Sequence, residues 1–130
     1  MSIAAITGSF DITLITNPAS AGTWTIANLG SGGFAPGRTF RVQQVLASVS
    51  GAAGITVTVR KNTGAGATCA VFTGAGGTVT DGPAVLTEGN TTFAATDNIH
   101  VEAVAGGLGA VLNKLILRCI ASDAQALTVT

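Results

Sequence analysis

The stretch that decides the fold is Ile55-Thr56-Val57-Thr58-Val59-Arg60, in which apolar and polar side chains alternate without a break. Successive side chains of a β-strand point to opposite faces, so a period of two predicts a strand with one buried face. We expect Ile55, Val57 and Val59 to point into a core. The sequence Lys61-Asn62-Thr63-Gly64 is typical of a turn, so this strand should lead directly into the next one.

Similar signals recur on both sides of this strand. Alternating or β-branched runs, separated by Gly- and Asn-rich turns, predict strands at residues 10–16, 23–29, 39–50, 68–72, 78–80, 84–88, 91–95, 99–104 and 112–121, with a turn at 81–83. No segment has the periodicity of an amphipathic helix. Short strands at a spacing of about 8–12 residues favour a sandwich. The sequence therefore predicts an all-β, antiparallel two-sheet β-sandwich of the jelly-roll type with about eight strands.

Two of these strands depart from simple alternation. In residues 39–50 the apolar side chains occupy both faces, which predicts a bulge or a change of buried face near Gln44. Residues 112–121 are apolar on both faces apart from Lys114 and Arg118. A strand of this kind is usually covered on both sides, by the core and by something else.

The length of 130 residues predicts one domain, which is large enough to bury a core without disulfides. Within it we expect residues 37–130 to form the sandwich and residues 1–36 to form an N-terminal arm or hairpin packed on it. The first residues lack the basic segment and the long apolar run of a secretory signal. We therefore expect Cys69 and Cys119 to be buried free thiols, with a disulfide between them left open.

Charge is scarce in this chain. Charged residues make up 9% of it and the formal net charge is zero, against about 25% charged residues in typical proteins. The absence of a basic excess argues against a nucleic-acid partner, and no apolar run is long enough to cross a membrane. We expect much of the surface to be covered by other copies or by a larger assembly, with a Thr- and Gly-rich monomer as the alternative.

The residues do not form a pattern that indicates an enzyme. His100 is the single histidine and stands two residues before Glu102, but an acid–base pair needs an orienting group and a pocket, so we expect a surface or subunit-contact role. Gly30-Ser31-Gly32-Gly33 lacks the spacing of a nucleophile elbow. Four carboxylates that could gather around calcium match no calcium-loop pattern: Asp81, Glu88, Asp97 and Asp123. We expect no catalytic residue, cofactor, metal or small-molecule substrate.

Residues 37–121 resemble the small jelly-roll proteins of tailed-bacteriophage virions, namely the capsid decoration (cement) proteins and the β-sandwich heads of fibres. The resemblance is carried by residues 55–62 and by residues 92–104, in which Asp97 precedes the penultimate strand. Asn98 stands where such proteins often have Gly. The resemblance implies a homotrimer that binds the major capsid protein and stabilises the shell. It places the protein on the outer capsid surface of the virion, and in the host cytoplasm during assembly.

Residues for these contacts follow from the two strands with the most apolar surface and from the looser ends. For the subunit interface we expect Ile99, Val101, Val104, Leu115 and Leu117. For an arm that grips the shell we expect Ile3, Phe10, Trp24 and Phe34, together with the tail 124–130.

Two alternatives share this fold. The first is a trimeric tail-fibre or spike head that binds a host receptor or glycan, for which the chain offers one Trp and five Phe as an aromatic platform. The second is a jelly-roll enzyme of the cupin type, whose usual metal site needs several histidines, whereas this chain has one.

Overall fold

The computed structural model describes residues 9–14, 22–30, 39–51, 54–74, 80–94, 96–105 and 111–121, with residues 9, 10, 22–30, 80 and 121 described by their backbone alone. The strands are β1 Ser9–Leu14, β2 Gly22–Gly30, β3 Phe40–Ser50, β4 Ile55–Lys61, β5 Thr68–Gly74, β6 Thr80–Pro83, β7 Val85–Leu86, β8 Thr92–Phe93, β9 Asn98–Ala105 and β10 Val111–Ala121. A short 3-10 helix, η1, spans Glu88–Asn90. Among these residues no helix is long and apolar enough to cross a membrane.

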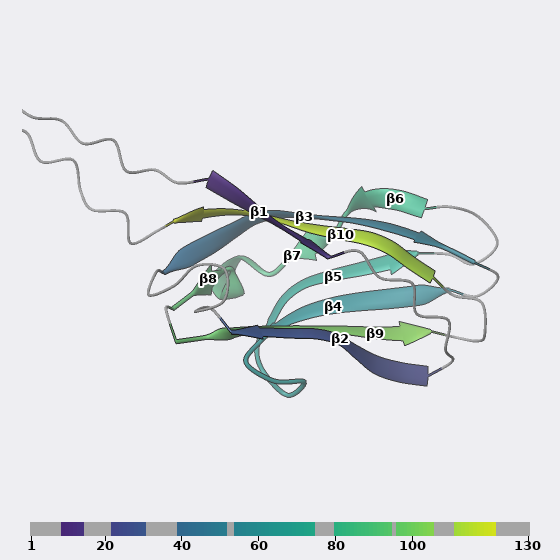
Figure 1. Cartoon of the computed structure of the whole chain (residues 1–130), viewed down its shortest axis with the longest axis horizontal. Helices are drawn as coiled ribbons and strands as arrows, with labels where there is room; N and C mark the ends of the chain where they lie inside the picture. The colour runs from purple at the N-terminus through teal and green to yellow at the C-terminus, as the bar shows by residue number, and fades with distance from the viewer. Residues whose placement is uncertain are drawn as a thin grey trace, which may run out of the picture.

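The strands form two antiparallel sheets that lie one above the other (Figure 1). Sheet 1 has the order β1-β10-β3-β6, with β8 also paired to β3, and sheet 2 has the order β2-β9-β4-β5-β7. The first strand thus pairs with the last, the second with the last but one, and β4 with β5, as in a long ribbon rolled into a sandwich. This is the jelly-roll topology that the sequence predicts.

On the side away from β10, β3 pairs with two short strands instead of one long strand. β6 and β8 pair with β3, while β7, which lies between them in the chain, pairs with β5 in the other sheet. We expected a turn at residues 81–83, but these residues belong to β6. Pro83 is tolerated there because an edge strand does not need a second row of backbone donors.

The inner face of β4 is as predicted. Ile55, Val57 and Val59 are at most 2% exposed. Thr58 points to the outer face and is nevertheless 7% exposed, because it lies in the middle of sheet 2 between Glu102 on β9 and Val71 on β5. Larger side chains on both sides therefore cover this short threonine.

The predicted change of face in β3 is also confirmed. Gln44 lies opposite Arg118 and Val42 lies opposite Cys119, so Gln43 is an extra residue in the pairing with β10. Such a bulge shifts the alternation by one residue. Buried positions of β3 are accordingly even-numbered before the bulge and odd-numbered after it.

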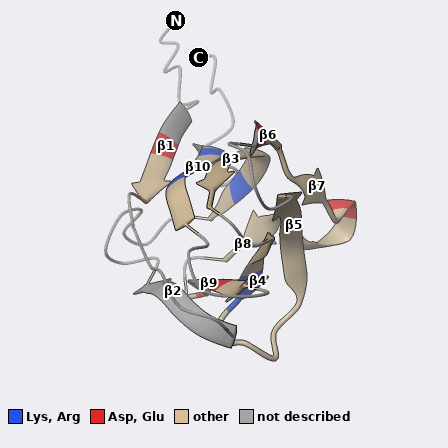
Figure 2. Ribbon diagram, turned by 90° about the vertical axis from the view of Figure 1, so that its right-hand side faces the viewer, with Lys and Arg blue, Asp and Glu red and all other residues tan. Residues whose placement is uncertain are grey.

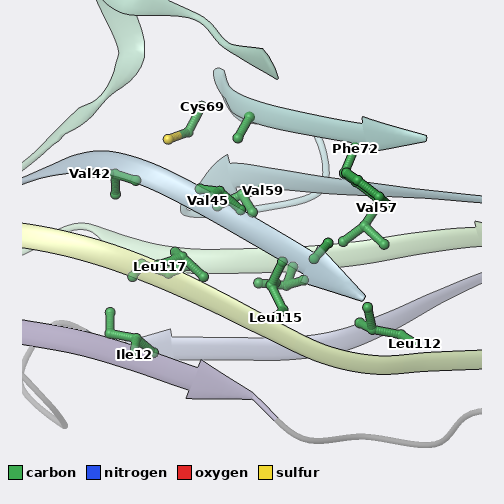
Figure 3. Close-up of a cluster of buried hydrophobic side chains, with 14 of the residues drawn as sticks. Ile12, Val42, Val45, Val57, Val59, Cys69, Phe72, Leu112, Leu115 and Leu117 are labelled. Carbon is green, nitrogen blue, oxygen red and sulfur yellow. The ribbon is translucent and has the colours of Figure 1, made fainter. Parts of the chain in front are cut away.

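Core side chains from both sheets fill the space between them (Figure 3). Leu112, Leu115 and Leu117 of β10 are fully buried against residues of β3, β4 and β5. At one end Phe40 stacks on Phe93 with 5.2 Å between ring centroids. These side chains are fully buried within one copy of the chain, so the core is closed without a second copy. Burying each of them contributes about 1.5–3 kcal/mol.

The two N-terminal strands belong to different sheets. β1 pairs with β10 at one edge of sheet 1, and β2 pairs with β9 at one edge of sheet 2. They therefore do not form a hairpin with each other. Residues 1–8, 15–21 and 31–36 of the expected arm lie outside the described residues, so a boundary between residues 36 and 37 stays a prediction.

Candidate functional site

Four of the five residues expected at a subunit interface lie inside the sandwich. Ile99, Val101, Leu115 and Leu117 are 0% exposed, whereas Val104 is 42% exposed. A side chain with no exposed surface cannot contact a second subunit while the core is intact. This assignment is therefore corrected: any contact made by β9 and β10 has to use their outward-pointing residues.

The residues expected in a shell-binding arm are only partly described. Phe10 lies in β1 opposite Cys119, and Trp24 lies in β2 opposite Ala103, both known from the backbone. Ile3 and Phe34 lie outside the described residues. A role of these four residues in shell binding stays a prediction.

His100 lies on the outer face of sheet 2 and is covered. It is 7% exposed, and its Nε2 atom is 3.9 Å from Oε2 of Glu102. A Cβ atom added to Gly64, in the turn after β4, would lie 3.4 Å from that Nε2. General acid–base catalysis needs a group that substrate can reach. His100 is closed off by the turn and has the packing of a structural residue.

Polar atoms around His100 lack partners. Both ring nitrogens of His100 and Nε of Arg60, which lies opposite on β4, are buried without a hydrogen bond in the described part of the chain. Each unpaired buried polar atom costs about 1–3 kcal/mol. Within the same residues no three His, Cys, Asp or Glu side chains lie close enough to hold a metal ion.

The turn that covers His100 is tied to the start of β9. Asn62, with φ of 68°, donates its backbone N–H to O of Asn98 at 2.8 Å and accepts the N–H of Asn98 on Oδ1 at 2.9 Å. Asp97 accepts Nδ2 of Asn62 on Oδ1 at 3.2 Å and the N–H of Ala94 on Oδ2 at 2.9 Å. Asp97 thus shapes the turn before the penultimate strand. The sequence singled out Asp97 and placed Asn62 in a turn, but it offered no signal that these two residues are partners.

The outer face of sheet 1 carries a row of neighbours with apolar residues at its centre. Thr13 of β1, Ile116 of β10, Leu46 of β3 and Pro83 of β6 lie side by side in the strand register. Leu46 and Ile116 are half-buried, and Thr13 and Pro83 are exposed. We call these four residues the apolar row.

Charged residues flank the apolar row on both sides. On one side Lys114, Ser48 and Asp81 lie in register across β10, β3 and β6. On the other side Asp11, Arg118 and Gln44 lie in register across β1, β10 and β3. Charged positions are sparse on the ribbon as a whole, and several of them lie on these strands (Figure 2).

A shallow groove follows this surface. Its volume is about 340 Å³, and its walls are Leu46, Ala47, Ser48, Asp81, Gly82, Lys114 and Ile116. The apolar character of both faces of residues 112–121 is the sequence signal for a covered outer face. The contributions of β3 and β6 depend on strand register: the apolar residues on both faces of residues 39–50 predicted a bulge, and residues 80–83 carry no such signal.

A second hollow lies at the break in the partner of β3. Its volume is about 250 Å³, and it is lined by Arg41, Val42, Gln43, Leu86, Glu88 and Thr91. Arg41, Gln43 and Glu88 are exposed. The hollow is thus a polar surface dip between β3 and η1, without a buried reactive group.

The two thiols are free and buried, as predicted. Cys69 is 0% and Cys119 is 2% exposed. Burial raises the pKa of the Cys69 thiol to about 11, and burial together with Cys69 and Asp11 raises that of Cys119 to about 12. A thiol reacts as its thiolate, so neither cysteine is a nucleophile near neutral pH.

Comparisons with known proteins identify no family. No family model and no curated protein matches this chain. Among solved structures, one of Desmodium yellow mottle tymovirus is 11% identical, with a TM-score of 0.41 over 100% of this chain and 95% of that one. Two of infectious bursal disease virus are 13% and 14% identical, with TM-scores of 0.38 and 0.34, over 93% and 97% of this chain and 39% and 38% of theirs. Since all these TM-scores are below 0.5, the fold assignment rests on strand order and register.

Proposed function

We propose that the protein is a structural component of a virus particle, a capsid decoration protein that binds the shell as a homotrimer and stabilises it. The observation that carries the proposal is the outer face of sheet 1, where the jelly roll presents an apolar row and a shallow groove with charged residues at its margins. Such a surface is suited to permanent cover by another protein. The resemblance of residues 37–121 to phage decoration proteins supplies the viral context.

The reactive groups support a structural role over an enzymatic one. His100 is covered by a turn, both thiols are buried, and both oxygens of Asp97 accept hydrogen bonds. The described residues can therefore interact with a partner through surface contacts. A protein that binds only the assembled state of a shell stabilises it by mass action, by an amount that grows with concentration.

The binding mode follows from the low charge. With zero formal net charge, attachment should rest on apolar burial, shape and backbone pairing. The open edges at β1 and β2 and the expected arm, residues 1–36, are candidates for strand addition to the shell. We therefore propose the outer surface of the virion as its location, with the host cytoplasm as the place of assembly.

The aromatic residues favour decoration over a receptor- or glycan-binding fibre head. Of five Phe in the chain, Phe40, Phe72 and Phe93 are in the core. A sugar platform needs exposed aromatic rings, and these three are not available for one.

The test is a solution mass followed by binding to expanded, undecorated shells of the parent particle. We expect a trimer that cosediments with the shells and raises the temperature at which they disrupt. Binding should change little between low and moderate salt, because the chain has zero formal net charge and only 9% charged residues. A monomer that ignores the shells would overturn the proposal.

A further inference from the structure

We propose that His100 and Glu102 of β9 bind a divalent transition-metal ion of the zinc class beneath the turn that follows β4. Nε2 of His100 and Oε2 of Glu102 are the two protein ligands, and water completes the coordination of the ion. The site lies on the outer face of sheet 2, on the opposite side of the sandwich from the apolar row. The inference therefore goes beyond the proposed function, and either one can fail without the other.

The first observation is a buried imidazole without partners. The side chain of His100 is 9% exposed, and neither of its ring nitrogens has a hydrogen-bond partner among the described residues. A buried polar atom is normally paired, and an unpaired one calls for an explanation such as a bound water or ion. A neutral imidazole keeps its proton on one nitrogen and a lone pair on the other. With the proton on Nδ1, the lone pair of Nε2 is available to a metal.

The second observation is the distance between the two ligand atoms. Nε2 of His100 and Oε2 of Glu102 are 3.9 Å apart, which exceeds the roughly 2.7–3.2 Å of a hydrogen bond. Zinc lies about 2.0–2.1 Å from an imidazole nitrogen and about 2.0–2.2 Å from a carboxylate oxygen. Because these two lengths add to slightly more than the observed separation, an ion fits between the atoms at a wide angle. A small rotation of Glu102, whose side chain is 20% exposed, brings that angle toward the tetrahedral value.

The strand geometry keeps both ligands on one face. His100 and Glu102 are two residues apart on β9, so they point to the same side of sheet 2. One imidazole nitrogen and one carboxylate oxygen suit zinc and its neighbours among the transition metals, whereas calcium and magnesium prefer oxygen ligands alone. A His and a Glu at this spacing do not predict a metal site from sequence, because the spacing does not reveal that the imidazole is buried and unpaired.

The turn above the two ligands leaves room for the ion. The connection between β4 and β5 extends from sheet 2 on the side away from sheet 1 (Figure 1), and Gly64 of this turn lies over both ligands. A Cβ atom added to Gly64 would be 3.3 Å from Oε2 of Glu102 and 3.4 Å from Nε2 of His100. Glycine therefore keeps open a space over the two atoms that any larger residue would fill. Water bound to the ion occupies that space in the proposed site.

Arg60 opposes the binding of a cation and limits its affinity. It lies opposite His100 on β4, and its Nη1 atom donates a hydrogen bond to Oγ1 of Thr68 on β5 at 2.8 Å. Since β4 separates β5 from β9, this bond holds the guanidinium group on the side away from Glu102. The negative charge of Glu102 attracts the ion, and the positive charge of Arg60 weakens the attraction. With two protein ligands we expect micromolar affinity, weaker than that of four-ligand structural zinc sites.

The test titrates zinc chloride into the full chain, free of affinity tags and stripped of metal with a chelator. We expect one zinc ion per chain by calorimetry, and a rise in melting temperature that magnesium and calcium do not reproduce. His100 is the single histidine, so its imidazole C–H resonances in the NMR spectrum report directly on binding. Glu102→Gln and His100→Leu should each weaken binding at least about tenfold, since even the loss of groups that only support a ligand commonly costs about 10–100-fold.

Two further variants leave both ligands in place. Gly64→Ala should weaken binding, because its methyl group occupies the space above the ligands. Arg60→Gln should tighten binding, because it removes the neighbouring positive charge. The control is the double variant Cys69→Ala, Cys119→Ala, which would lose zinc bound at the thiols and should keep zinc bound at His100. Circular dichroism should show that all variants keep the fold.

The outcomes separate the zinc site from its alternatives. A chain without saturable zinc binding overturns the inference, and this is the result expected if a water molecule bridges the two atoms. Binding that survives both Glu102→Gln and His100→Leu, or that is lost with the thiols, overturns it as well. A chain that binds shells and ignores zinc overturns only the inference, whereas a chain that binds zinc and ignores shells supports it and overturns only the proposed function.

Discussion

The two outer faces of the sandwich differ in how far the chain itself covers them. On sheet 2 the outward residues of β4 are threonines and Arg60. Thr56 and Arg60 have side-chain partners on the neighbouring strand β5. Oγ1 of Thr56 is 3.4 Å from Oγ1 of Thr73, and Nη1 of Arg60 donates to Oγ1 of Thr68 at 2.8 Å. The turn at Gly64 then covers His100.

On sheet 1 the corresponding positions hold Leu46 and Ile116, with charged residues at the margins. Both side chains are half-buried against their own neighbours. The low number of charged residues therefore has a different structural consequence on each sheet. On sheet 2 short polar residues and a turn cover the middle of the face, although Val104 of β9 and Val85 of β7 stay exposed, whereas on sheet 1 half-buried apolar residues lie at the centre of the face.

The largest expected effect separates the inner face of β10 from its outer face. Leu117→Ala should destabilise the fold by about 2–5 kcal/mol, because the side chain is fully buried and a cavity remains. Ile116→Thr, one residue away, should cost less than about 1.5 kcal/mol and should weaken binding to shells instead. Urea denaturation measures the first quantity and cosedimentation with shells the second. Equal losses of stability would contradict the placement of the two faces.

The next effect concerns the turn that completes sheet 2. A Cβ atom at Gly66 would collide with the backbone O of Lys61, so Gly66→Ala should cost about 1–3 kcal/mol. Gly89→Ala is the matched control, because nothing lies within 4 Å of the added atom there. Its stability should stay within about 0.5 kcal/mol. Two variants that melt at the same temperature would show that the turn does not constrain the fold.

A smaller effect of opposite sign is expected at His100. His100→Leu removes two buried nitrogens that lack partners among the described residues. Replacing unsatisfied polar groups by an apolar side chain of similar size is neutral or stabilising, so stability should change by about 0 to +1 kcal/mol. Calorimetry on the variant in a metal-free buffer checks this. A clear loss of stability would mean that the ring nitrogens have partners.

The smallest effect at neutral pH comes from the buried thiols. Their pKa values are raised from 9.0 to about 11 for Cys69 and about 12 for Cys119. The unfolded chain therefore loses these protons at lower pH than the folded protein, and stability should fall as pH rises above about 9. Below pH 9 the thiols should contribute no pH dependence. The double variant Cys69→Ala, Cys119→Ala should reduce the alkaline loss, and a thiol reagent should label the native protein only after denaturation.

Much of the fold is readable from local patterns. The period of two in residues 55–60 predicts both the strand and its buried face, because a pleated strand has no other way to separate apolar from polar side chains. The bulge near Gln44 is readable for the same reason, since the apolar residues change parity there. The expected interface fails where this logic stops. Residues 112–121 are apolar on both faces, so the pattern cannot say that Leu115 and Leu117 point inward.

The sequence by itself determined the class of structure, the strands and the scarcity of charge. The tertiary structure decided which apolar residues are left outside. Leu46, Pro83 and Ile116 are far apart in the chain, and they become neighbours only because the ribbon rolls up and sets β3 between β6 and β10. Register between distant strands depends on the packing of the whole core, which no local pattern encodes. The apolar row therefore exists only in the folded protein.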